Sequence, residues 1–270
     1  MTATRTDEEL LALYDEQVRG SLGQRLPPTW RLEHDGPLSR CFTPREGFAM
    51  FTADAADLAH EDLVALVDRT FDAYRQAGSA FEWKTFDHDR ADLLPLLRER
   101  GARAEPHEAL VLGEARLLAA EPELPEGLAL RRVTERRDLE RVAAMESEVW
   151  GEDWAWLADD LEERLSGEDP VEVLVVEDGE LVVSAAWLVP LTGTEVAGLW
   201  GGSTLAAYRG RGVYRALVAA RATSALAHGC TVLQVDASDD SRPILERLGL
   251  RTVGGTTPYA VGAPSDTGSG

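Results

Sequence analysis

The stretch YRGRGVYRAL, which begins at Tyr208, combines glycine and arginine in a pattern that suits the binding of an anion. Gly210 and Gly212 let the backbone approach a ligand closely and adopt dihedral angles that other residues avoid. A run of helix-forming residues follows, and the first turn of a helix presents unpaired N–H groups and the positive end of the helix dipole. Positive charge is added by Arg209, Arg211 and Arg215. We therefore expect a site for a phosphate-bearing ligand, with a tight turn carrying solvated arginines as the alternative.

Two familiar phosphate-binding motifs are absent from the chain. The P-loop pattern GxxxxGK[ST] does not occur, and the single lysine, Lys84, lies far from the turn in sequence. The dinucleotide-binding pattern GxGxxG also fails, because Arg215 stands where the third glycine would be. The turn therefore belongs to neither of these classes of site.

The composition of the whole chain narrows the class of partner. The 270 residues carry a formal net charge of −21, which argues against nucleic acid or an anionic membrane because both need a basic face. The same charge is compatible with the attraction of cationic small molecules. Cys41 and Cys230 show no disulfide or metal-binding spacing, so we expect no metal. The polar N-terminus and the lack of a long apolar run predict a cytoplasmic protein without a membrane span.

Hydrophobic periodicity predicts the elements that position the turn. A strand at 195–205 precedes it, and a helix from Val213 to His228, ended by Gly229, follows it. Other helices are predicted at 7–20, 60–76, 92–101, 135–150 (capped by Thr134), 156–167 and 241–249. Other strands are predicted within 39–53, at 80–86, 107–113 and 128–134, as a hairpin at 171–191 that turns at Asp178-Gly179, and at 231–237 and 251–261.

The stretch EARLLAAEPELPEG predicts a linker, because it is rich in Glu, Pro and Ala and lacks a sheet pattern. With the linker placed at 114–126, the chain divides into domains at 1–113 and 127–262. The tail at 263–270 is expected to be disordered.

An internal repeat relates the two halves of the chain. PLLRERGAR at 95–103 aligns with PILERLGLR at 243–251, and the order helix, strand, helix, strand surrounds both segments. We interpret this order as a duplication. The first half has no glycine-arginine turn, because only TADAADLAHE precedes its helix.

Within this order of elements, RGRGVYRAL resembles motif A of the GNAT superfamily of N-acetyltransferases, whose pattern is Gln/Arg-x-x-Gly-x-Gly/Ala. Arg209 matches the first position and Gly212 the central glycine, whereas Tyr214 departs from the small residue of the last position. SRPILERLGL resembles the helix that follows in the family. The resemblance covers 127–262 and implies an α/β (α+β) fold of two GNAT-like domains. Each would be a mixed, mostly antiparallel sheet flanked by helices, with the N-terminal domain degenerate.

The resemblance also implies a ligand and an activity. The ligand would be acetyl-CoA, and the activity the transfer of its acetyl group to the amine of a small, cationic molecule. The pantetheine arm would pair with the backbone of Gly202, Ser203 and Thr204. The pyrophosphate would lie on Arg209, Gly210, Arg211, Gly212, Val213, Tyr214 and Arg215, with Ser238 as a further cofactor contact.

The residue that protonates the leaving thiolate is not the usual one. The family places a tyrosine in the helix after the fifth strand, and that position here is Leu245. Tyr259 on the last strand is the nearest substitute, with a half-buried strand tyrosine as the alternative reading. Asp236 could relay a proton or be a turn carboxylate.

The acceptor site of the family involves a loop that corresponds here to VWGEDWAWLADD. Aromatic rings with carboxylates suit an organic cation, although the tryptophans could equally form a packing cluster. The expected substrate-binding residues are Trp150, Glu152, Trp154 and Trp156. Two functions stay open: an acyl-CoA-dependent N-acyltransferase, and a non-catalytic acyl-CoA-binding protein in which loss of the tyrosine marks loss of turnover.

Overall fold

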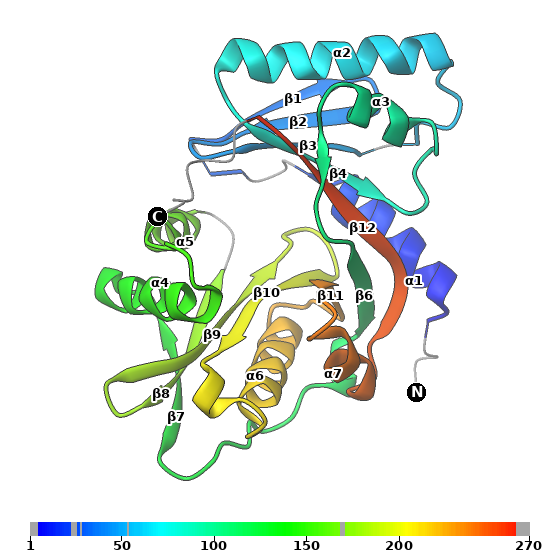
Figure 1. Ribbon diagram of the computed structural model, residues 1–270. Helices are drawn as coiled ribbons and strands as arrows, with labels where there is room; N and C mark the ends of the chain where they lie inside the picture. Colours follow the sequence, from blue (N-terminus) through cyan, green and yellow to red (C-terminus); the bar gives the residue numbers. More distant parts are fainter. Residues whose placement is uncertain (1–4, 23–25, 28, 53, 168–170, 263–270) are drawn as a thin grey trace. The chain divides into compact units, whose positions relative to one another are not determined.

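A computed structural model describes most of the chain (Figure 1). The described residues are 5–22, 26–27, 29–52, 54–167 and 171–262. The tail expected to be disordered, 263–270, lies outside the described residues.

The chain contains both helices and strands. The helices are α1 (Asp7–Tyr14), the π-helix η1 (Asp15–Arg19), α2 (His60–Ala77), α3 (Leu93–Glu99), the 3-10 turn η2 (Ala115–Leu117), α4 (Arg136–Trp150), α5 (Leu157–Ser166), the 3-10 turn η3 (Ala206–Tyr208), α6 (Val213–Ala227) and α7 (Arg242–Arg247). The strands are β1 (Arg31–Asp35), β2 (Leu38–Phe42), β3 (Gly47–Phe51), β4 (Phe81–Phe86), β5 (Arg103–Ala104), β6 (Glu108–Glu114), β7 (Leu128–Val133), β8 (Glu172–Asp178), β9 (Leu181–Pro190), β10 (Val196–Thr204), β11 (Val232–Ala237) and β12 (Arg251–Val261).

The described residues form two compact units. The first unit contains the chain up to Val111, the segment Asp236–Glu246 and the chain from Arg251 onward. The second unit contains Leu112–Val235 and Arg247–Leu250. The C-terminal strand β12 therefore belongs to the first unit.

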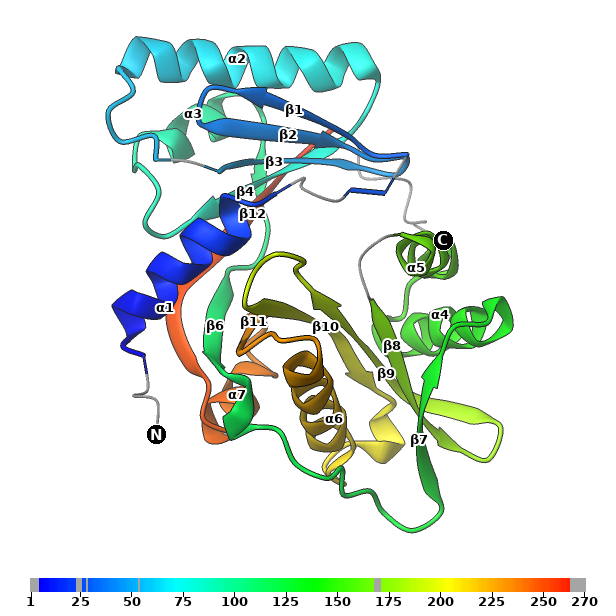
Figure 2. The ribbon, with the colours of Figure 1, turned by 180° about the vertical axis from the view of Figure 1, so that it is seen from behind.

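The sheet of the first unit has the order β1-β2-β3-β4-β12. β1, β2 and β3 are antiparallel, β3 and β4 are parallel, and β4 pairs antiparallel with β12. Figures 1 and 2 show α2 lying over β1, β2 and β3. The helix buries a stripe at helical spacing and ends at Gly78, whose φ of 65° is the left-handed conformation that favours glycine. The buried residues of α2 are Leu63, Leu66, Val67, Thr70 and Tyr74.

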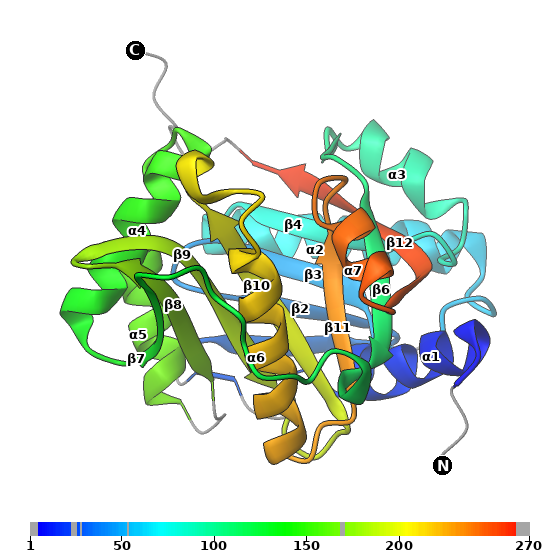
Figure 3. The ribbon, with the colours of Figure 1, turned by 90° about the horizontal axis from the view of Figure 1, so that it is seen from below.

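The sheet of the second unit has the order β7-β8-β9-β10-β11. Its strands are antiparallel up to β10, and β10 and β11 are parallel. α6 makes the crossover between those two strands and lies across β10 (Figure 3). Side chains on both faces of β9 are buried, because α4 and α6 both pack on it.

One sequence of elements occurs twice along the chain. It runs β3–α2–β4–α3 the first time and β10–α6–β11–α7 the second time, with a parallel strand pair around the crossover helix each time. The aligned segments 95–103 and 243–251 contain most of α3 and most of α7, and a strand begins at the last residue of each segment. The expected two-domain α/β architecture, mostly antiparallel and flanked by helices, is confirmed. The domain limits at 113 and 127 stay a proposal.

Some local details differ from the sequence prediction. The N-cap of α4 is Glu135, without a side-chain cap hydrogen bond, so the predicted cap at Thr134 is wrong. β1 was not predicted, and the first helix continues beyond Tyr14 as a π-helix. Across the described ranges, no helix is both long and apolar enough to cross a membrane.

Candidate functional site

The glycine-arginine turn, defined as residues 209–215, joins η3 to α6 in the second unit. Gly210 and Gly212 have φ values of 71° and 86°, which are conformations that only glycine adopts readily. The Ala216 N–H donates to the carbonyl oxygen of Gly212 at 3.0 Å, as in the first turn of a helix. The N–H groups of the preceding helix residues therefore have no acceptor within α6. They form a ready anion site at the positive end of the helix.

The arginines of this turn are exposed, and within the described ranges no carboxylate forms an ion pair with them. Arg209 donates from Nε to the carbonyl oxygen of Thr204 at 2.9 Å. The guanidinium of Arg211 lies over the ring of Tyr208, 5.1 Å from its centre. Two of the three charges are thus oriented by the backbone or by an aromatic ring and are not neutralised. This is unusual in a chain with a net charge of −21.

β10 carries a bulge beside the turn. The pairing of β10 with β9 shifts register between Gly201 and Ser203, and Gly201 and Gly202 have φ values of 65° and 97°. β10 pairs with β11 only over 196–198. The β11 side of 199–204 therefore has no strand partner in the β10–β11 register, and an extended ligand could pair with this backbone.

Each glycine of the bulge faces an aromatic ring. A Cβ atom on Gly201 would lie 2.5 Å from the ring of Trp187, and one on Gly202 would lie 2.7 Å from the ring of Tyr214. Neither position has room for a side chain. Tyr214, which departs from the small residue of the family motif, is accommodated because Gly202 leaves space for its ring.

Arg221 on α6 is fully buried behind the bulge. It donates to the carbonyl oxygens of Trp200 at 3.1 Å and Trp187 at 3.4 Å. Burial lowers the pKa of Arg221 to about 10, so the guanidinium stays charged at neutral pH. It also interacts with the Tyr214 hydroxyl, whose pKa burial raises.

A buried carboxyl that was not singled out from the sequence lies next to the same strand. Glu146 on α4 is 1% exposed. Its Oε2 accepts a hydrogen bond of 2.9 Å from Trp150 Nε1. The Ser203 hydroxyl is close enough to favour the charged form, yet no well-formed hydrogen bond reaches Oε1, which has no partner among the described residues. Burial raises the pKa of this carboxyl.

The predicted acceptor tryptophans form a continuous aromatic series. The rings of Trp150 and Trp154 stack at 6.1 Å, and those of Trp154 and Trp156 lie 5.1 Å apart. Trp154 and Trp156 pack against the hydrophobic core, whereas Trp150 is 58% exposed. Glu152 is exposed in the loop between α4 and α5. The packing reading therefore fits Trp154 and Trp156, and the role of this loop in binding the acceptor stays a prediction.

The other predicted residues, Tyr259, Asp236 and Ser238, belong to the first unit. Tyr259 is 1% exposed in its hydrophobic core, and its hydroxyl accepts a hydrogen bond of 2.9 Å from Arg98. Asp236 forms an ion pair with Lys84. Ser238, which is exposed, accepts from the Ser241 N–H at 3.4 Å. These surroundings give no support to Tyr259 as an acid, and its catalytic role, like that of Asp236, stays a prediction.

The ion pair of Asp236 belongs to a cluster of charged groups within the first unit. Burial opposes the charged form of Lys84, but the carboxylate of Asp236 raises the pKa of Lys84 above its usual value. Burial also raises the pKa of Glu82 to about 7 and that of Glu108 in the same direction. Asp236 is therefore engaged in holding a lysine.

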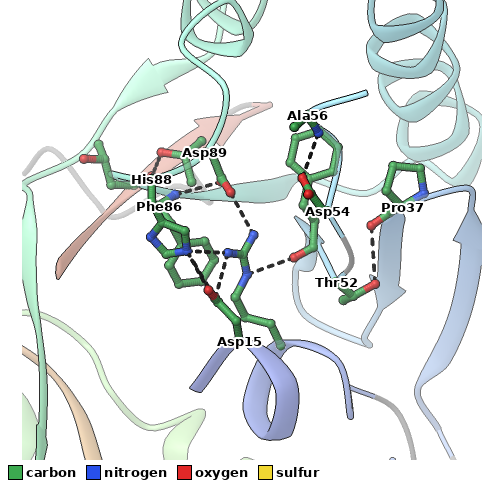
Figure 4. A network of polar contacts seen from close by, with 12 residues as sticks. Asp15, Pro37, Thr52, Asp54, Ala56, Phe86, His88 and Asp89 are labelled. Atoms are coloured by element: carbon green, nitrogen blue, oxygen red, sulfur yellow. Dashed lines mark hydrogen bonds and ion pairs between the residues drawn. The ribbon is translucent and has the colours of Figure 1, made fainter. Parts of the chain in front are cut away.

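The first unit also contains a network of hydrogen bonds around one arginine (Figure 4). Asp15, His88 and Asp89 converge on the guanidinium of Arg19, at 2.9, 2.8 and 2.8 Å. Arg19 also donates to the carbonyl oxygen of Phe51 at 3.1 Å. With its donors occupied in this way, Arg19 fixes the end of η1 to the loop after β4.

Comparison with known proteins agrees with this geometry. Residues 136–250 match the model of the Acetyltransferase (GNAT) family. A GCN5-related N-acetyltransferase from Kribbella flavida is similar in structure, with a TM-score of 0.67 and 17% identity over 92% of this chain and 93% of that one. A tandem GNAT protein from the clavulanic acid biosynthesis pathway gives a TM-score of 0.64 and 14% identity over 98% and 99%.

A third solved structure extends the same pattern. A GCN5-related N-acetyltransferase from Sphaerobacter thermophilus gives a TM-score of 0.60 and 16% identity over 92% of this chain and 84% of that one. No curated protein matches the chain. At these identities the structures establish the fold, and the match to the family model is limited to 136–250, a range that contains the turn and the bulge. Residues 136–250 therefore form an acetyltransferase domain of the GNAT family, in a chain with the fold of tandem GNAT proteins.

Proposed function

We propose that the chain transfers the acetyl group of acetyl-CoA to the amine of a small, cationic molecule. One observation carries the proposal: the glycine-arginine turn presents helix N–H groups without an acceptor in α6 and three arginines that pair with no carboxylate of the described residues, next to a strand that β11 leaves unpaired over 199–204. An elongated ligand with a polyanionic end fits this combination. Acetyl-CoA supplies such an end and a reactive thioester.

Each part of the site has a role in binding. The N–H groups of Val213, Tyr214 and Arg215 would donate to the pyrophosphate, because they have no acceptor within the helix. The arginine side chains would add charge-assisted hydrogen bonds. The backbone around Gly202 and Ser203 would pair with the pantetheine arm, and a backbone N–H at the bulge would stabilise the oxyanion of the transition state.

The leaving thiolate needs little help from the protein. Leu245, at the family's usual tyrosine position, is completely buried and carries no proton donor. A thiol has a pKa of about 8.5, so its anion is a good leaving group near neutral pH. Tyr259 and Asp236 remain proposals for this step, and solvent is a sufficient source of the proton.

Replacement of Gly212 by glutamate tests the acetyl-CoA site. The new carboxylate would stand where the pyrophosphate binds, so calorimetry should detect no binding of acetyl-CoA. Gly179→Glu is the matched control, because Gly179 also has a positive φ, of 58°, and open space around it, but lies in the β8–β9 turn. Unchanged affinity in Gly212→Glu would show that the turn does not hold the cofactor.

A non-catalytic acyl-CoA-binding protein is the second candidate, favoured by the apolar Leu245. Release of free CoA in the presence of a panel of small amines separates the two functions. The proposed enzyme should release CoA faster with cationic amines than without an acceptor. Tight binding of acetyl-CoA with no release for any amine would favour the binding protein.

A further inference from the structure

We propose that Glu146 is the base that takes the proton from the acceptor ammonium group. This inference rests on the proposed acetyl transfer and adds a residue that sequence reasoning did not identify. Three observations support it: the position of the carboxyl group, the contacts of its two oxygen atoms, and the tryptophan that lies against it.

Glu146 lies on the buried face of α4, where a carboxyl group is unexpected. α4 buries one face, and Glu146 is on that face together with Leu139, Val142 and Ala143. A buried polar atom left without a hydrogen bond destabilises a protein by roughly 1–3 kcal/mol. Oε1 of Glu146 is such an atom among the described residues. Packing alone would favour an apolar side chain here.

The unpartnered oxygen lies beside the strand that would hold the acyl donor. Ser203, whose hydroxyl acts on Glu146, follows the bulge directly, and α4 contacts β10. The backbone of Ser203 is part of the edge expected to pair with the pantetheine arm. The carboxyl is therefore next to the part of β10 where the thioester end of the donor would lie.

Trp150 connects the buried carboxyl to an exposed residue. Its indole N–H donates to Oε2 at 2.9 Å, and the residue is 58% exposed at the end of α4. Gly151, with a φ of 72°, ends the helix there and begins the acceptor loop. An aromatic face beside a carboxylate is a favourable place for an ammonium group. An amine bound against Trp150 would supply the hydrogen bond that Oε1 lacks.

The proton balance of the reaction needs one base and no external co-reactant. Glu146 accepts one proton from the ammonium nitrogen and leaves a neutral amine. The nitrogen forms a bond to the thioester carbon, and the carbon–sulfur bond breaks. The second proton on nitrogen goes to the sulfur, which gives the amide and free CoA. Glu146 then returns its proton to solvent.

The electrostatic surroundings agree with this role. Burial raises the pKa of Glu146 and so brings its basicity nearer to neutral pH, where general bases work best. Besides burial, the groups that act on this pKa among the described residues are Ser203 and Trp150, and neither carries a charge. The carboxylate thus lacks a cation of its own, which the substrate would provide.

Replacement of Glu146 by glutamine tests the proposal with a series of primary amines of decreasing pKa. For amines that are ammonium ions at the assay pH, kcat/KM should fall about 10²-fold or more, while acetyl-CoA affinity by calorimetry stays the same. The defect should shrink for amines that are already neutral. Glu140→Gln is the matched control, because Glu140 is an exposed residue of the same helix.

The results separate this inference from the proposed function. An equal loss for all amines would show that Glu146 has a structural role only, and full activity of Glu146→Gln would also overturn the inference. In both cases the wild-type protein would still acetylate amines. If the wild-type protein binds no acetyl-CoA, the proposed function itself fails.

A measurement without substrate gives a second test. A carboxyl whose folded pKa lies above its ordinary 4.5 holds its proton longer in the folded state. The wild-type protein should therefore lose stability relative to Glu146→Gln as pH rises from 4.5 through the folded pKa. Urea unfolding across this range measures the difference, and a difference that does not change with pH would contradict the inference.

A further variant covers the case that glutamine at position 146 prevents folding. Trp150→Phe keeps an aromatic ring but removes the donor to Oε2, so the pKa of Glu146 should rise further. The pH above which kcat/KM reaches its plateau should shift upward. An unshifted profile would argue against Glu146 as the titrating base.

Discussion

At the scale of single residues, Arg221 shows how a buried charge sets the geometry of the site. Its guanidinium holds the carbonyl oxygens of Trp187 and Trp200. A peptide group is planar, so a fixed Trp200 carbonyl also fixes the N–H of Gly201, which points in the opposite direction. Arg221 therefore acts as a positioning residue for the bulge, without touching a ligand.

Arg221→Met should disturb both folding and catalysis. Two buried carbonyl oxygens would lose their donor, and we expect a loss of roughly 1–3 kcal/mol in the free energy of unfolding. We expect kcat to fall about 10²-fold, the order of magnitude for a lost oxyanion donor. Urea unfolding and steady-state kinetics measure the two effects. Arg136→Met, at an exposed position of α4, should change neither.

Asp138 makes the stability of the second unit depend on pH in the acid range. Arg131 donates two hydrogen bonds to it, at 2.7 and 2.9 Å, and lowers its pKa from 3.8 to about 2, with help from Arg141. A lowered folded pKa contributes stability above pH 3.8, and this contribution is lost as pH falls toward 2. Asp138→Asn should thus be less stable than wild type at pH 5 and nearly equal at pH 2. Thermal unfolding across this range tests it, and a constant difference would refute it.

At the scale of elements, the sequence was sufficient to predict a helix or strand where apolar residues recur at the spacing of that element. The apolar stripe of α2 and the αL glycine after it were both readable from the sequence. β1 was missed because RLEHD carries little apolar alternation and is only partly buried. The pairing of β12 with β4 was also out of reach, since pairing joins residues far apart in sequence and leaves no local pattern.

The candidate site was also predictable only in part. The turn was singled out because glycines and arginines before a helix suit the binding of an anion, with a tight turn carrying solvated arginines as the alternative. Glu146 was missed because a glutamate in an amphipathic helix usually faces solvent. The available signal was its spacing: Glu146 lies seven, four and three residues after Leu139, Val142 and Ala143, and so continues the buried stripe.

A comparison of the two crossover helices predicts one acetyl-CoA per chain. The first turn of α6 has no acidic residue, whereas Glu61 and Asp62 lie in the first turn of α2 and would repel a phosphate. Calorimetry should give a stoichiometry of one. A value of two, or binding that survives Gly212→Glu, would show that the first unit also holds the cofactor.

At the scale of the whole molecule, the charge distribution separates the two substrates. The chain carries a net charge of −21, yet the arginines of the turn pair with no carboxylate in the part of the chain that the structure describes. The proposed cationic acceptor would therefore be attracted by the chain as a whole, and the proposed polyanionic donor by the turn.

This charge predicts a specific dependence on salt. When ionic strength rises, kcat/KM should fall for a cationic amine and change less for a neutral amine of similar size, because salt screens the long-range attraction. The effect is measured by steady-state kinetics from about 10 mM to about 500 mM salt. Over this range the Debye length changes by on the order of threefold to tenfold. Equal salt dependence for both amines would show that the net charge does not steer the acceptor.

The place of β12 also affects the order of events during synthesis on the ribosome. The strand that pairs with β4 and carries Tyr259 into the core of the first unit is made after the second unit, although most of the first unit is made before it. At roughly 5–20 residues per second, the nascent chain waits many seconds with one edge of β4 unpaired. An unpaired edge is a template for aggregation. We therefore expect β4 to need protection until 251–261 have been made, and a messenger truncated before codon 251 to yield a chain whose first unit cannot be completed.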